Sequence, residues 1–126
     1  MSTVREVSHP KIAEAQAILT AVGMPRGQQN ARTALVLLAL AGMRRTSRWS
    51  EVSASNRLGI TEMMEWMREA YDKDYAPNSR ETVRRFSVHQ MIAAGLIRQN
   101  ADRALPINSP DNRYALSPGF VKVLRA

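Results

Sequence analysis

Residues 77–97, with the sequence PNSRETVRRFSVHQMIAAGLI, limit most strongly what this chain can fold into. Asn78 followed three residues later by Glu81 is typical of a capping box, in which two side chains satisfy free amides of a first helical turn. Gly95 is typical of the left-handed residue that ends a helix. The stretch therefore predicts a helix over residues 79–94.

This helix has two different faces when its residues are placed at α-helical spacing. One face carries Val88, Met91 and Ile92, which suit packing against a core. The opposite face mixes hydroxyl, amide, imidazole and apolar side chains: Ser79, Thr82, Val83, Phe86, His89 and Gln90. Three basic residues flank that face: Arg80, Arg84 and Arg85.

Basic residues near the start of a helix oppose its macrodipole, so something outside the helix should compensate them. A phosphate backbone is the natural partner for such residues. The alternative is an arginine-rich surface helix that only packs through its apolar face.

The sequence after this helix favours the first interpretation. Residues 96–98 and 113–116 predict two short strands around a polar stretch rich in Pro and Asn. A helix that leads into such a hairpin is typical of a winged helix, in which the helix enters the major groove. We therefore predict a mainly α fold with a small β-hairpin: a winged helix-turn-helix with an extra N-terminal helix, a recognition helix at residues 79–94 and a wing at residues 100–112.

The remaining segments predict elements that support this unit. Apolar residues at helical spacing predict an amphipathic helix over residues 10–22, and the apolar run within residues 28–43 predicts a helix buried on several sides. Further helices are expected over residues 61–71 and 118–125. Residues 48–50 predict a small third strand, with Trp49 either filling the core or lying against DNA. Residues 1–8 are expected to be flexible, and residues 9–126 to form one DNA-binding domain.

Charge and composition narrow the class of partner. The chain has 126 residues and a formal net charge of +7, and fifteen of its eighteen basic residues are arginine. Arginine suits bidentate contacts to phosphate or guanine, so duplex DNA is the expected partner. A genome that favours arginine codons is an alternative explanation of the high arginine content. The absence of cysteine fits a cytoplasmic setting. No apolar run is long enough to span a bilayer, so no membrane contact is expected.

Residue patterns for catalysis are nearly absent. The sequence lacks the glycine-rich phosphate-binding motifs and the zinc-protease motif. Its two histidines, His9 and His89, have no carboxylate at a triad-like or ligand-like spacing. Asp111 follows a proline, as at the start of some magnesium nuclease centres, but Phe120 stands where a second acid would have to precede Lys122. We expect no catalytic residue, no cofactor and no metal site in this chain.

Several motifs together resemble a known family. They are residues 75–85 (YAPNSRETVRR), 89–90, 94–95, 108–110 and 114–116, with residues 28–30, 49–51 and 59–61 upstream. From about Ala15 onward the chain resembles the N-terminal helix-turn-helix domain of the BsuBI/PstI family of type II restriction endonucleases. The resemblance implies a winged-helix domain that precedes a separate nuclease domain, which uses magnesium to cleave both strands of a short palindrome. This chain would then be the DNA-binding part, with the nuclease domain elsewhere in a full-length protein.

The leading hypothesis is sequence-selective binding of duplex DNA, with the helix over residues 79–94 in the major groove. The side chains expected to contact bases are Ser79, Arg80, Thr82, Val83, Phe86, His89 and Gln90. The side chains expected to hold phosphates are Arg45, Arg48, Arg84, Arg85 and Arg103. Gln90 suits adenine and Arg80 suits guanine or a phosphate, whereas Phe86 stands where a polar residue is expected. A palindromic target would favour a homodimer, unless another domain supplies the twofold symmetry.

Three alternatives remain open from the sequence. The domain could read a methylated base through Phe86 or Trp49, or it could be a stand-alone transcription regulator. In a different class, the helix could bind a protein partner through Phe86 and Val83. Binding to DNA that weakens steeply with salt separates the last alternative from the others.

Overall fold

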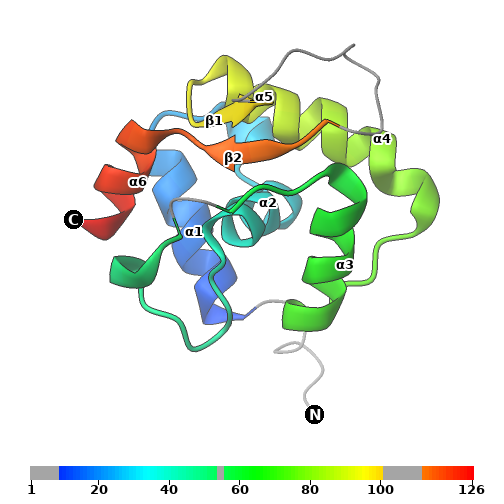
Figure 1. Ribbon diagram of the computed structural model, residues 1–126, viewed down its shortest axis with the longest axis horizontal. Helices are drawn as coiled ribbons and strands as arrows, with labels where there is room; N and C mark the ends of the chain where they lie inside the picture. The colour runs from blue at the N-terminus through cyan, green and yellow to red at the C-terminus, as the bar shows by residue number, and fades with distance from the viewer. Residues whose placement is uncertain (1–8, 54–55, 101–111) are drawn as a thin grey trace.

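Helix α2 (Ala31–Ala41) is the centre around which the other elements pack (Figure 1). The computed structural model describes residues 9–53, 56–100 and 112–126. Every residue of α2 from 33 to 41 is buried, as expected for a helix that is apolar nearly all round. The Asn30 side chain caps its start by accepting from the Thr33 amide at 2.9 Å, and Gly42, with φ of 68°, ends it.

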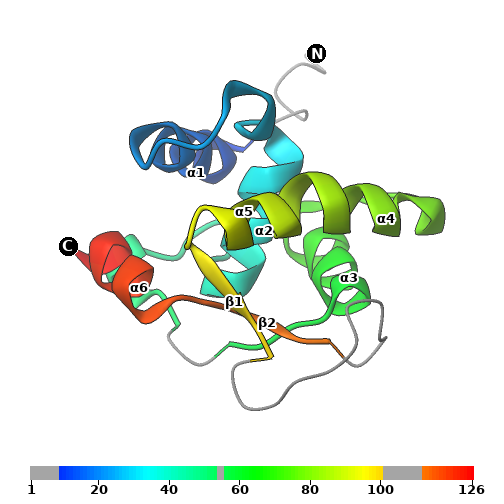
Figure 2. The ribbon, with the colours of Figure 1, turned by 90° about the horizontal axis from the view of Figure 1, so that it is seen from above.

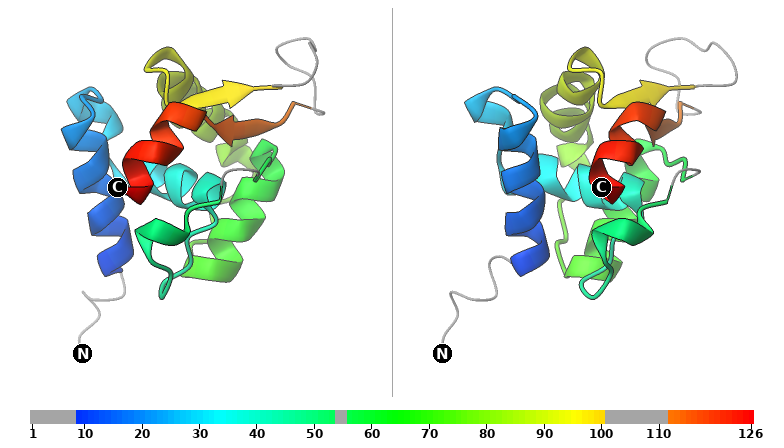
Figure 3. Two further views of the ribbon diagram at one scale, coloured as in Figure 1. Left: turned by 60° about the vertical axis from the view of Figure 1, so that its left-hand side comes forward. Right: turned by 90° about the vertical axis from the view of Figure 1, so that its left-hand side faces the viewer.

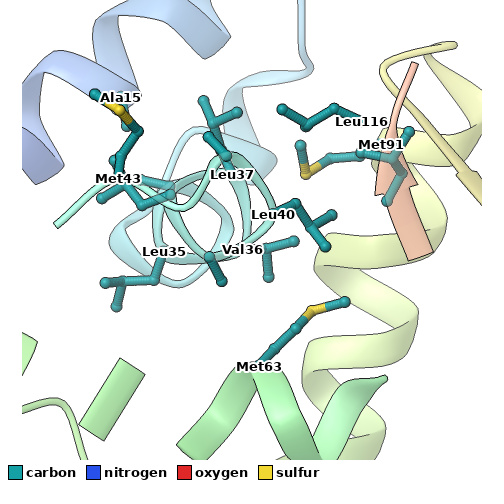
Figure 4. Packing of buried hydrophobic residues seen from close by; sticks show 14 of the residues in the cluster. Ala15, Leu35, Val36, Leu37, Leu40, Met43, Met63, Met91 and Leu116 are labelled. Atoms are coloured by element: carbon teal, nitrogen blue, oxygen red, sulfur yellow. The ribbon is translucent and has the colours of Figure 1, made fainter. Parts of the chain in front are cut away.

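Several elements meet α2 from different directions. Figure 3 shows α1 (Pro10–Ala21) on one side of α2 and α3 (Ile60–Tyr71) on the other, with the short 3-10 turn η2 (Arg26–Gln28) between α1 and α2 in the chain. Figure 4 shows Leu35, Leu37 and Leu40 pointing away from the α2 axis in different directions. The core therefore has no single packing face, and its neighbours are placed relative to one another through α2.

A long helical rod lies across α2 (Figure 2). It consists of the 3-10 turn η4 (Pro77–Ser79), α4 (Arg80–Val83), the π-helical turn η5 (Arg84–Val88) and α5 (His89–Ala93). We call residues 77–93 the recognition rod. The antiparallel strands β1 (Ile97–Gln99) and β2 (Tyr114–Leu116) follow it, with Ile97 opposite Leu116, and α6 (Pro118–Arg125) packs near η3 (Trp49–Glu51).

This arrangement confirms the predicted fold class. The molecule is mainly α with a small β-hairpin, a winged helix-turn-helix with α1 as the extra N-terminal helix. Within the described ranges, no helix is both long and apolar enough to cross a membrane. The expectations for residues 1–8, and for residues 101–111 of the wing predicted at residues 100–112, lie outside the described residues.

The predicted third strand at residues 48–50 is wrong. These residues enter the 3-10 turn η3, with the Arg48 amide donating to Glu51 Oε1 at 2.8 Å. The position beside the hairpin is taken by Leu58, which forms an antiparallel bridge with Tyr114 through bonds of 3.0 and 2.9 Å. A single bridging residue has no period-2 pattern, so strand signals in the sequence could not identify it.

The predicted capping box at the start of the rod is also wrong, whereas the predicted helix end is confirmed. Pro77 starts the rod two residues before Ser79, because its fixed φ suits a first helical position. Asn78 therefore lies inside a helical turn, and no side chain caps η4 or α4. Gly95, with φ of 79°, ends the rod as expected, and the Leu96 amide donates to Met91 O at 2.9 Å.

Replacing Leu40 by alanine should test the central role of α2. Leu40 is fully buried, so Leu40→Ala should lower the free energy of unfolding by about 2–5 kcal/mol. Chemical denaturation measures this change. Val123→Ala is the control, because Val123 is 59% exposed and its truncation should cost less than about 0.5 kcal/mol. Equal effects of the two substitutions would contradict the assignment of α2 as the core.

Candidate nucleic-acid interface

The recognition rod leaves one long side open to solvent. Arg80, Glu81, Arg85 and Phe86 are exposed on it, and Phe86 is 47% exposed despite being a large apolar residue. Four more predicted contact residues are half-buried on the rod: Ser79, Thr82, His89 and Gln90. We call the side formed by Arg80, Glu81, Thr82, Arg85, Phe86, His89 and Gln90 the recognition surface. Most of the predicted base-contact residues are thus brought together on one element.

Val83 is an exception, and the prediction that it faces the DNA groove is wrong. Val83 and Val88 are both fully buried, although they are five residues apart. In an α-helix, residues at that spacing lie about 140° apart around the axis, so both could not occupy the centre of one buried stripe. The π-helical turn between them adds a residue to the turn and brings Val83, Val88 and Met91 onto the same buried side.

The π turn also determines what Gln90 can do. The His89 amide donates to Arg84 O, five residues back, where an α-helix would use Arg85 O. Arg85 O instead accepts from the side-chain amide of Gln90, with Nε2 at 3.3 Å. One N–H of the Gln90 amide is thus engaged within the rod, and its second N–H and its Oε1 remain for the predicted contact with adenine.

Glu81 is a recognition-surface residue that the sequence reasoning did not identify. Its carboxylate is held by the Arg84 guanidinium, with Arg84 Nη2 2.7 Å from Oε1 and 2.6 Å from Oε2, and Arg85 Nε lies 3.9 Å from Oε2. The hydrogen bond from Arg84 holds the pKa of Glu81 below its usual value. The predicted phosphate ligand Arg84 is thus already paired within the rod. Its spacing of three residues from Glu81 could have signalled this pair.

His89 is only partly available as a groove contact. Its Nε2 atom is buried and has no hydrogen-bond partner in the part of the chain that the structure describes. Burial lowers the pKa of His89 from its usual value, and the nearby positive charge of Arg84 lowers it further. His89 is therefore held neutral near pH 7, with one ring nitrogen turned away from solvent.

The end of the rod adjoins the hairpin, because α5 leads directly into β1 and packs against it. Burial raises the pKa of Tyr114 on β2, and the positive charges of Arg84 and Arg80 act against that rise. Arg80 is exposed, and Arg98 is exposed on the neighbouring strand β1. Both the rod and the hairpin thus carry an exposed arginine.

Two predicted phosphate ligands, Arg45 and Arg48, do not lie on the recognition surface. They belong to the segment around η3, which lies at the opposite end of the molecule from α5 (Figures 1 and 3). The Arg45 guanidinium lies over the ring of Tyr71, 5.9 Å from its centroid. Trp49 packs toward α1, where its Nε1 donates to Glu14 Oε1 at 2.8 Å, so the structure supports its packing role rather than a DNA contact.

Arg103 lies outside the described residues, so its predicted role as a phosphate ligand stays a prediction. Among the residues that the structure describes, no group of three or more metal-ligating side chains comes together. The recognition surface offers guanidinium, hydroxyl, imidazole, amide and aromatic groups, a set suited to binding through contacts with phosphates and base edges.

Comparison with known proteins identifies the family. A model described as the BsuBI/PstI restriction endonuclease HTH domain matches residues 9–126. The type II restriction enzyme BsuBI of Bacillus subtilis is 44% identical over 121 residues, which cover 95% of this chain and 38% of that protein. The type II restriction enzyme AplI of Arthrospira platensis is 36% identical over 104 residues, covering 82% and 32%.

A solved structure agrees with these matches. The structure of SdaI restriction endonuclease superposes with a TM-score of 0.86 at 33% identity, over 90% of this chain and 36% of that one. The chain thus spans about a third of the length of these relatives. The resemblance found in the sequence is confirmed, and the chain belongs to the BsuBI/PstI restriction endonuclease HTH domain family.

Proposed function

We propose that this chain binds duplex DNA with sequence preference, as the recognition domain of a type II restriction endonuclease. The observation that carries the proposal is the open side of the recognition rod, framed by arginines and placed beside a hairpin in a helix-turn-helix family. In this arrangement the rod enters the major groove and the hairpin approaches the flanking backbone. The cutting reaction, with its magnesium ions, would belong to a further domain, for which the greater length of the relatives leaves room.

The contacts divide by position along the rod. Arg80 is exposed near its start and can donate to guanine or to a phosphate. Arg85 is exposed and only weakly engaged with Glu81, at 3.9 Å, so it is the best-placed phosphate ligand of the rod. Arg98 on β1 would contact the backbone beside the groove.

Phe86 provides an apolar contact at the middle of the surface. Its ring is 47% exposed, and the Arg85 guanidinium lies 5.8 Å from the ring centroid. In the major groove an apolar side chain can contact the methyl group of thymine, or of a methylated cytosine. Selection of bound oligonucleotides from random and methylated libraries would identify the target and show whether methylation matters.

DNA binding by the chain should weaken steeply with salt. About four phosphate contacts predict a loss of affinity of about 100-fold between about 50 and 200 mM salt, because bound phosphates release counterions. Fluorescence anisotropy with the selected duplex measures this dependence. Affinity that does not change with salt, or absence of binding, would contradict the proposal and favour a protein-binding role for Phe86.

Arg80→Ala should relax the preference at one base pair. Loss of a bidentate guanine contact is expected to cost about 1–3 kcal/mol at that position and much less elsewhere. Competition with duplexes that vary one base pair at a time measures the effect. Arg48→Ala is the matched control, because Arg48 is also exposed but lies at the other end of the molecule. A uniform loss over all duplexes would assign Arg80 to a phosphate instead.

Glu81→Gln should strengthen binding to every sequence. The substitution removes a negative charge that faces the DNA backbone and releases Arg84 from its forked ion pair. The slope of log affinity against log salt should steepen by up to about one, since Arg84 becomes free to contact a phosphate. Glu69→Gln is the matched control, because Glu69 is exposed and pairs with Arg44 at 2.9 Å, away from the recognition surface. Weaker binding by Glu81→Gln would instead indicate a direct contact between Glu81 and a base.

A further inference from the structure

The π-helical turn in the recognition rod is held by a polar network that none of the predicted contacts uses. Arg32, in the first turn of α2, donates from Nε to Ser87 Oγ at 2.9 Å. Its Nη2 atom donates to Phe86 O at 3.4 Å. Thr33 Oγ1 lies 2.8 Å from Ser87 Oγ. One end of α2 is thus bonded to the two central residues of the turn.

Burial makes this network specific. Thr33 and Ser87 are both fully buried, and a buried hydroxyl without a partner is costly, so the Thr33 hydroxyl depends on Ser87, whose own hydroxyl also accepts from Arg32. The start of α2 is itself fixed, since Asn30 Oδ1 accepts from the Thr33 amide at 2.9 Å. The network therefore connects a rigid point of the core to the middle of the rod (Figure 2).

The turn sets the orientation of half of the recognition surface. It joins α4, which carries Arg80 and Thr82, to α5, which carries His89 and Gln90. A π turn contains one residue more than an α-helical turn. It therefore rotates α5 about the helix axis, relative to α4, by the angle that one residue covers in an α-helix, about 100°. The side chains that α5 presents to solvent thus depend on whether the turn keeps this geometry.

We propose that Arg32, Thr33 and Ser87 are positioning residues for base recognition. They hold the π turn in place and thereby fix how Phe86, His89 and Gln90 face the DNA relative to Arg80. The proposal rests on the proposed function, since it assumes that the recognition rod reads bases. Arg32 acts here through Ser87 and the Phe86 carbonyl, and no contact between these three residues and a base is required.

Arg32→Lys gives the sharpest test. Lysine keeps the positive charge, but a single ammonium cannot reproduce the planar fork that bonds Ser87 Oγ and Phe86 O together. Preference at the base pairs read by Phe86 and Gln90 should fall about five- to tenfold, within the range for a lost base contact. Preference at the base pair that Arg80→Ala relaxes should be unchanged, as should the salt slope. Hydrogen exchange at the His89 amide should accelerate, because its bond to Arg84 O belongs to the loosened turn.

Two further variants control for charge and folding. Arg26→Lys makes the same substitution at an exposed arginine of η2 and should leave every readout unchanged. Ser87→Ala removes the hydroxyl that both Arg32 and Thr33 bond. It should cause the same loss of preference at the base pairs read by Phe86 and Gln90, provided that circular dichroism shows the variant to be folded. If Ser87→Ala unfolds, Arg32→Lys still tests the positioning role, because Arg32 is only half-buried and its substitution should leave the chain folded.

The outcomes separate this inference from the proposed function. The positioning role would be overturned if Arg32→Lys lowered the preference equally at every base pair, or at none. This holds even when Arg80→Ala lowers the preference at the one base pair that Arg80 contacts. Absence of any sequence preference in the unsubstituted chain would overturn both proposals.

Discussion

The burial of α2 on all sides is the constraint on which the rest of the structure depends. A helix that is apolar nearly all round must be covered from several directions, so α1, α3, the recognition rod and β2 each supply part of the cover. The rod contributes Val83, Val88 and Met91 to this cover, and its opposite side is thereby left to solvent. The exposed recognition surface is a direct consequence of how the core is closed.

The fold could be predicted from the sequence because its signals are local and repeated. The apolar run of α2, the amphipathic pattern of α3, the left-handed Gly95 and the two short strands each follow from spacing or residue type. The bridge at Leu58 could not be predicted, because one hydrogen-bonded residue has no periodicity. The strand predicted at residues 48–50 is wrong for a related reason, since a single β-prone residue, Trp49, in so short a segment suits a 3-10 turn as well as a strand.

The candidate site was predicted less well, because its residues are placed by a departure from ideal helix geometry. Placing residues at 3.6 per turn puts Val83 and Val88 on different sides of the rod, whereas the π turn buries both. Phe86, Thr82 and Gln90 remain on the open side as expected. The hydrogen bonds that hold the turn join residues 54 and 55 positions apart, and no local pattern contains that information.

Charge in the sequence is also a poor guide to charge on the surface. Arginines at 44, 45 and 48 form a cluster in the sequence, yet the fold carries them away from the rod, where Arg44 pairs with Glu69 and Arg45 covers Tyr71. On the recognition surface Glu81 neutralises Arg84, which leaves Arg80 and Arg85 as the main open cations of the rod. A DNA-binding surface with an internal carboxylate gives up part of its attraction for phosphates in general. Since that attraction is the same for every sequence, its loss lowers the affinity for all sequences by the same factor, and discrimination between sequences is left to the contacts with bases. Under the proposed function, selectivity therefore depends on how rigidly the base-reading side chains are held, which is the role that the braced π turn would serve.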